Sequence, residues 1–189
     1  KVEAIKMKYD LACNAWKECG FQKELYLGSE ILWEEGVIDA LESGKALTIN
    51  ETSYVLVEFL LNEGYEYVEN AMRKLQYAGY FPIIAHVERY SQLQSPKVLE
   101  KLVDMGVYLQ ANVSTILGNH GFWRKRRILR CLKKGLIQFV GTDAHSPRAR
   151  RPEMKRCTQY LEKKLGVEKT RQILEENPGK MLKGERLNG

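Results

Sequence analysis

Two short segments place a histidine next to charged side chains directly after an apolar run. In "IIAHVER", His86 is followed by Arg89, and in "FVGTDAH", Asp143 is followed by His145. Imidazole nitrogens and carboxylate oxygens are the ligands with which proteins hold manganese, iron or zinc. The chain has only three histidines. The setting of two of them therefore predicts a metal site.

Basic residues follow the second segment closely, at Arg148, Arg150 and Arg151. A guanidinium group matches the geometry of phosphate oxygens, so arginines beside metal ligands favour chemistry on an anionic substrate. A second basic segment, residues 124–134, holds seven lysines and arginines and no acidic residue. It is either a solvated helix face or a surface that attracts an anionic partner such as phosphate, phosphoprotein or nucleic acid.

Apolar segments typical of strands alternate with amphipathic segments typical of helices. The predicted strands are 24–30, 53–59, 81–86, 107–113 and 136–143. The predicted helices are 33–44, 65–79, 95–106 and 124–134, followed by 152–165 and 167–176. This alternation predicts an α/β fold whose parallel sheet is buried on both faces. Both an open doubly wound sheet and a barrel fit the pattern.

Polar side chains stand where the predicted strands end. In parallel α/β folds, functional groups collect at the carboxyl ends of the strands. We therefore expect Glu30, His86, Asp143 and His145 to converge in one pocket. Glu58 also ends a strand, although it could equally pair with a basic neighbour, and His120 is predicted to be a turn residue.

Several classes of protein are excluded or disfavoured by the sequence. No apolar run reaches the roughly 20 residues of a membrane helix, so no membrane insertion is expected. Neither of two glycine-rich nucleotide-binding motifs, GxGxxG and GxxxxGK(S/T), occurs in the sequence. The four cysteines form no CxxC pair, which disfavours structural zinc and favours reduced thiols in the cytoplasm. No arginine lies six residues after any cysteine, and this excludes the Cys-x5-Arg phosphatase mechanism.

The chain opens without a methionine and within an amphipathic segment. Apolar residues from Val2 through Ile5, Tyr9 and Trp16 to Cys19 recur in steps of three and four, which predicts one buried helical stripe. We expect that the natural chain extends further at the N-terminus.

Taken together, "PIIAHVERY" and "GTDAHSPRARRPEM" resemble bacterial tyrosine phosphatases of the polymerase-and-histidinol-phosphatase (PHP) superfamily. The resemblance covers nearly the whole chain and includes "YLGSEI" and "GVYLQANVSTILGNHG". It implies a distorted (β/α) barrel, with residues 1–189 forming the C-terminal three quarters of a single PHP-type catalytic domain. That family's early His-x-His strand, Asp-bearing loop and Thr-Pro-His segment are not in this chain, so we expect an incomplete barrel that lacks its first strands.

The resemblance also assigns roles to residues. It makes Glu30, His86, Asp143 and His145 ligands of Mn²⁺, or of iron or zinc, in a di- or trinuclear site of the complete protein. Arg89 matches an arginine beside that site. Arg150 matches an arginine that binds phosphate, although Arg151 stands where the family often has proline, so the choice between the two stays open.

The implied reaction is hydrolysis of phosphotyrosine on a bacterial tyrosine kinase that regulates capsular or exopolysaccharide synthesis. The implied partner is the phosphorylated tail of that kinase rather than nucleic acid. Two alternatives stay open. One is a histidinol-phosphate or other small phosphoester hydrolase of the same superfamily, and the other is a non-catalytic module that binds anions or nucleic acid.

Overall fold

The computed structural model describes residues 2–146 and 152–187. Five parallel strands form one sheet, in the order β1-β2-β3-β4-β5. Their bounds are β1 (Glu30–Leu32), β2 (Tyr54–Glu58), β3 (Phe81–Ile84), β4 (Tyr108–Asn112) and β5 (Phe139–Gly141). The strands follow one another across the sheet as they do along the chain. The reversal of strand order that defines a doubly wound sheet is therefore not seen among the described residues.

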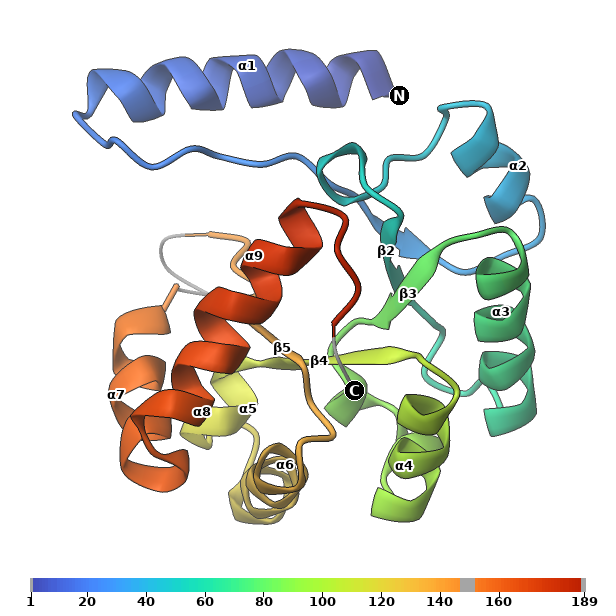
Figure 1. The fold of residues 1–189 in the computed structure, drawn as a ribbon, viewed down its shortest axis with the longest axis vertical. Helices are drawn as coiled ribbons and strands as arrows, with labels where there is room; N and C mark the ends of the chain where they lie inside the picture. Colours follow the sequence, from blue (N-terminus) through green and yellow to red (C-terminus); the bar gives the residue numbers. More distant parts are fainter. Residues whose placement is uncertain (1, 147–151, 188–189) are drawn as a thin grey trace.

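Helices connect the strands (Figure 1). Their bounds are α1 (Val2–Glu18), α2 (Val37–Glu42), α3 (Tyr65–Tyr77), α4 (Pro96–Asp104), α5 (Val113–Leu117), α6 (Phe122–Lys134), α7 (Met154–Leu165), α8 (Val167–Arg171) and α9 (Asn177–Leu182). Short 3-10 turns occur at Ile49–Glu51, Val87–Arg89 and Ser91–Leu93. No helix of the described chain is long and apolar enough to cross a membrane.

Alternate residues of each strand pack on opposite faces of the sheet. Val55 and Val57 of β2 and Leu109 of β4 belong to the main core, together with buried residues of α3, α4, α6 and α7. These connecting helices therefore cover one face. The long apolar stripe of α3, with Val68, Met72 and Leu75 fully buried, shows why this segment forms a helix at this face.

The opposite face holds a smaller cluster of aromatic residues. Tyr54, Ile83 and Phe139 are buried there, and the ring of Tyr54 lies 5.2 Å from that of Phe81 and 5.5 Å from that of Tyr108. The C-terminal segment covers part of this cluster, since the Tyr54 hydroxyl donates to the Glu185 carbonyl at 2.7 Å. The second face is thus only partly buried, with Leu56, Phe81 and Tyr108 half-buried around the cluster.

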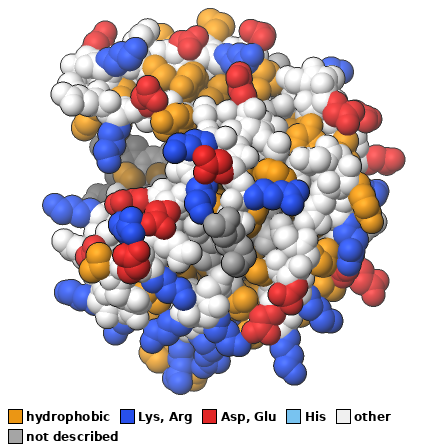
Figure 2. Space-filling model, viewed as in Figure 1, with side chains coloured by type: hydrophobic (Ala, Val, Ile, Leu, Met, Phe, Trp, Pro, Cys, Tyr) orange, Lys and Arg blue, Asp and Glu red, His pale blue; other side chains and the backbone are white. Residues whose placement is uncertain are grey.

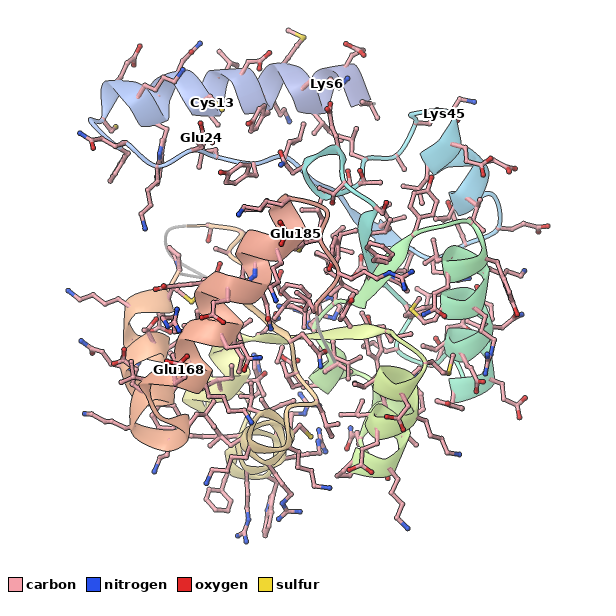
Figure 3. All side chains as sticks on the ribbon, viewed as in Figure 1. Lys6, Cys13, Glu24, Lys45, Glu168 and Glu185 are labelled. Atoms are coloured by element: carbon pink, nitrogen blue, oxygen red, sulfur yellow. The ribbon has the colours of Figure 1, made fainter. Side chains whose placement is uncertain are left out.

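The N-terminal helix differs from the prediction. The expected buried stripe is wrong, because no residue of Val2–Glu18 is buried. The helix folds back on the extended segment that follows it, as Cys13 and Glu24 show (Figure 3). The Tyr9 hydroxyl donates to the Leu25 carbonyl at 2.7 Å, and Trp16 stacks on Phe21 at 4.1 Å. An extended segment offers too little surface to bury a helix face, so the stripe is only half covered.

Three element boundaries also differ from the prediction. The strand expected at 24–30 begins only at Glu30, since the residues before it have no strand partner. The short helix α5 was not expected. The last predicted helix, 167–176, continues to Leu182 through a wide π-helical turn at Gln172–Glu176. Pro178 explains that turn, because proline lacks the N–H and the space needed for a regular α-helical bond four residues back.

The main core gives a direct stability prediction. Leu109→Ala should lower the free energy of unfolding by about 2–5 kcal/mol, because Leu109 is fully buried and the lost side chain leaves a cavity. Urea denaturation followed by circular dichroism measures the change. Tyr77→Ala is the control, because Tyr77 is 88% exposed and should change stability by no more than about 0.5 kcal/mol. Equal losses in the two variants would contradict this description of the core.

Candidate metal centre

Three side chains from neighbouring strands meet near the carboxyl ends of β2 and β3. Glu30 stands at the start of β1, Glu58 ends β2, and His86 follows β3. His86 Nε2 lies 2.8 Å from Glu30 Oε1 and 3.3 Å from Glu58 Oε2. One ligand atom from each residue lies within 4.8 Å of the other two. Two carboxylates and one imidazole at this spacing fit a divalent cation.

The imidazole is held from its other side. His86 is 3% exposed, and its Nδ1 lies 3.4 Å from the Tyr90 hydroxyl. That hydroxyl also accepts the Phe59 backbone N–H at 3.0 Å, and burial raises the pKa of Tyr90 to about 12, which keeps the phenol protonated. The Tyr90 oxygen has room for a second donor. With Nδ1–H donating to it, Nε2 presents its lone pair to the carboxylates, the tautomer that a metal ligand requires.

A second group of side chains lies beside the first. Arg89 Nη2 is 2.5 Å from Asp143 Oδ2, and Asn112 Nδ2 donates to the same oxygen at 3.0 Å. His145 Nδ1 lies 3.3 Å from Asp143 Oδ1. Asp143 is mostly buried, whereas the His145 side chain is 61% exposed. This group presents an exposed imidazole and an arginine around one carboxylate.

Gln110 of β4 links the two groups. Its Oε1 accepts the His86 backbone N–H at 2.5 Å, and its Nε2 donates to Asn112 Oδ1 at 2.9 Å. Asn112 in turn donates to Asp143. A continuous row of hydrogen bonds therefore runs across β4 from the first group to the second. Gly141 of β5 makes room for it, because a Cβ there would lie only 2.6 Å from Gln110 Nε2.

The backbone is unusual at both ends of this row. His86 has φ of 34° and Asp143 has φ of 50°, values in the left-handed region that non-glycine residues rarely adopt. In the described chain only Asn50 and Glu51 share this feature among non-glycine residues. Such conformations cost free energy and persist where surrounding contacts fix them. Both left-handed residues at the sheet edge are residues predicted to bind metal.

A small pocket opens beside the second group. It has a volume of about 210 Å³, and its lining residues are Leu61, Glu88, Arg89, Asn112, Thr115, His120 and Arg124. Glu88 is buried, and its Oε1 accepts the Asn112 backbone N–H at 3.0 Å. Burial raises the pKa of the Glu88 carboxyl. Two arginines and a histidine thus surround a cavity that is large enough for one small anionic group.

The predicted site residues divide between these two groups. Glu30 and His86 are in direct contact, and Asp143 and His145 are in direct contact, while the Gln110 row connects the pairs. Arg150 and Arg151 lie outside the described residues. The role of Arg150, or of Arg151 in its place, as a phosphate contact stays a prediction. Sequence reasoning left Glu58 open, and its position at the end of an apolar strand, like that of His86, was the feature that could have placed it here.

Comparisons with known proteins identify the family of this chain. The family model described as capsular polysaccharide synthesis, CpsB/CapC, matches residues 1–183. The chain belongs to the CpsB/CapC family. Tyrosine-protein phosphatase CpsB of Streptococcus pneumoniae is 28% identical over 172 residues, which are 88% of this chain and 71% of that protein. Tyrosine-protein phosphatase YwqE of Bacillus subtilis is 32% identical over 161 residues, which are 85% of this chain and 63% of that protein.

A solved structure of this family has the same fold. It comes from crystal structures of YwqE from Bacillus subtilis and CpsB from Streptococcus pneumoniae, described as unique metal-dependent tyrosine phosphatases. The TM-score is 0.89 at 28% sequence identity, and the match covers 98% of this chain and 75% of the other. An α/β fold with a parallel sheet, as predicted, is confirmed by this match.

The cysteines stand apart from the site and give a testable prediction. Cys131 and Cys157 are fully buried, and burial raises the pKa of the Cys157 thiol to about 12. Cys13 and Cys19 lie on the exposed N-terminal part. Ellman's reagent should therefore titrate these two thiols in the native protein, and all four after denaturation. Rapid labelling of Cys131 or Cys157 in the native protein, detected by mass spectrometry, would contradict their burial.

Proposed function

We propose that this protein is a metal-dependent protein-tyrosine phosphatase of the PHP type. The observation that carries the proposal is the cluster of Glu30, Glu58 and His86 near the carboxyl ends of β2 and β3, in a chain that belongs to the CpsB/CapC family. The relatives named tyrosine-protein phosphatases and the metal dependence of the solved structures support it. No cysteine lies in the site, so a thiolate nucleophile plays no part.

The residues present fit a divalent metal. Glu30, Glu58 and His86 would hold one ion, and Asp143 with His145 would supply ligands to a second or third. A mixed carboxylate and imidazole donor set suits manganese or iron and also accepts zinc, so Mn²⁺ remains our first choice. Bound metal of this kind polarises phosphoryl oxygens and lowers the pKa of a coordinated water.

The protein's own side chains would orient the phosphoryl group. Arg89 makes its described contact through Nη2 alone, which leaves the other guanidinium donors of a side chain 35% exposed for a phosphate oxygen. Arg150, seven residues after Asp143, is proposed as a second phosphate contact. The 210 Å³ pocket beside Arg89 would receive the anion away from bulk water.

Three further parts of the proposal concern the whole chain. The sheet is proposed to be part of a distorted (β/α) barrel in one catalytic domain, because its strand order is sequential and one face is lined with helices. A cytoplasmic location is proposed because the four cysteines are free thiols. The substrate is proposed to be phosphotyrosine on a bacterial tyrosine kinase that regulates capsule synthesis, and the family description, which names capsular polysaccharide synthesis, supports the link to the capsule.

The central experiment combines metal binding with catalysis. Calorimetry should show Mn²⁺ binding, and His86→Ala should weaken it by at least roughly tenfold. Mutating a residue that only hydrogen-bonds a metal ligand already lowers metal affinity by about that factor, and His86 is itself a proposed ligand. The Mn²⁺-loaded protein at its natural full length should hydrolyse a phosphotyrosine peptide, and both EDTA and His86→Ala should abolish this. Cys131→Ser is the matched control and should retain activity.

Two outcomes would overturn the proposal. One is hydrolysis that persists in EDTA, and the other is unchanged Mn²⁺ affinity in His86→Ala. A strong preference for histidinol phosphate over phosphotyrosine peptide would instead support the small-phosphoester alternative.

The role of Arg89 is tested separately. Arg89→Ala should lower kcat/KM for a phosphotyrosine peptide about tenfold to more than a hundredfold, because a hydrogen bond to a charged group is worth about 1.5–3 kcal/mol. Arg73→Ala, on α3 and paired with Glu69, should leave kcat/KM unchanged. If Arg89→Ala reduced Mn²⁺ affinity by the same factor as kcat/KM, the arginine would act through Asp143 and not on the phosphoryl group.

A further inference from the structure

A wide basic groove runs between α6 and α7. It has a volume of about 510 Å³, and its lining residues are Phe122, Lys125, Arg126, Leu129, Arg130, Lys133, Tyr160 and Lys164. Five of these are lysine or arginine, and none is acidic. Figure 2 shows lysine and arginine side chains gathered at the lower end of the molecule, where α6 lies in Figure 1.

The charges in this groove lack compensation within the described chain. Elsewhere on the helix, Lys134 pairs with Glu100 at 2.7 Å, and Arg127 donates to Gln94. By contrast, no carboxylate of the described residues pairs with Arg126, Arg130 or Lys133. Arg126 and Arg130 are also four residues apart on one helix, a spacing at which like charges repel. An anionic ligand would relieve this repulsion.

The floor of the groove is aromatic but already occupied. Lys125 Nζ lies 4.2 Å from the centre of the Tyr160 ring, and Lys164 Nζ lies 5.8 Å from it. Cations over this ring compete with a nucleobase, which would need the ring face for stacking. Two exposed aromatic residues, Phe122 and Trp123, stand at the start of α6, and of these Phe122 lines the groove. The occupied ring of Tyr160 favours an acidic peptide over single-stranded nucleic acid.

The groove adjoins the candidate site. His120 and Arg124 line the small pocket that contains Arg89, and the next residues of α6 line the basic groove. The first turn of α6 therefore contributes residues to both cavities, Arg124 to the small pocket and Phe122 and Lys125 to the groove. The 13 residues of α6 extend about 20 Å at a rise of about 1.5 Å per residue. An extended peptide covers that distance with roughly six residues.

We propose that the basic groove, between α6 and α7, binds an acidic segment of the phosphotyrosine-bearing substrate. The segment lies within roughly six residues of the phosphotyrosine along the chain. This inference rests on the proposed function, since it takes the small pocket and metal centre as the position of the phosphotyrosine. The groove then selects substrates by the charge of the sequence around that residue.

A binding experiment tests the inference without requiring turnover. The probe is a fluorescent peptide that contains a non-hydrolysable phosphonate analogue of phosphotyrosine and five glutamates, placed on either side in separate versions. A matched peptide has five serines. Fluorescence anisotropy should show tighter binding of one glutamate peptide, and the difference should shrink as salt rises.

The decisive variant is Arg126→Glu combined with Arg130→Glu. It should weaken binding of the preferred glutamate peptide roughly tenfold or more, because ion pairs with the two arginines are lost and the new glutamates repel the peptide. Binding of the serine peptide should change little. The control is Lys97→Glu combined with Lys101→Glu, which has the same charge change and spacing on α4 but lies outside the groove. Circular dichroism confirms that both proteins are folded.

The outcomes separate the inference from the proposed function. The inference is overturned if the glutamate and serine peptides bind equally well. It is also overturned if the groove variant and the control lose the same amount of affinity for the glutamate peptide. The same holds if the groove variant loses binding to an oligonucleotide or to anionic vesicles while its peptide binding is unchanged. If p-nitrophenyl phosphate and phosphotyrosine peptides are not hydrolysed with Mn²⁺ by the natural full-length protein without substitutions, the proposed function fails, whatever the peptide-binding result.

Discussion

Two carboxylates beside one buried imidazole form the constraint on which the rest of this structure depends. Glu30 and Glu58 both approach the same nitrogen of His86, and a single ring nitrogen offers one hydrogen or one lone pair. Like charges held close together near a low-dielectric interior are unfavourable without a compensating cation. The left-handed backbone of His86 and its contacts to Tyr90 and Gln110 hold this arrangement in place.

The charge distribution around the site follows from that constraint. A cluster of carboxylates repels an anionic substrate, so a protein that acts on phosphate must supply positive charge close by. Here Arg89 and Arg124 lie in the small pocket, and α6 adds a row of basic residues beyond it. The position of the basic residues is therefore more informative than the net charge of +6, because they lie beside the cluster of carboxylates and can attract an anionic substrate to it.

The strands and most helices could be predicted because their patterns are local. The apolar runs of β2 to β4 and the amphipathic α3 and α4 fall within the predicted segments, and α6 begins two residues before its predicted segment. The edge of the sheet at which the site forms could also be predicted, because the carboxyl ends of parallel strands lie at the same edge. The position of Glu58 at a strand end was a signal for the site, but its contact with His86 depends on strand register and on a left-handed turn, which the sequence does not show. Solvation of α1 was missed because periodicity shows a face but not what covers it.

The space that the missing side chain of Gly141 leaves for Gln110 has an evolutionary consequence. Gln110 fills that space, and its amide supports the backbone of His86 on one side and Asn112 on the other. A methyl group at position 141 would displace this amide, and the His86 N–H would then lose its acceptor. Positions 110 and 141 should therefore vary as a pair among homologues, with any larger residue at 141 accompanied by a shorter one at 110. If only one of these two residues were exchanged with that of a relative, the new side chain would not fit the unchanged partner.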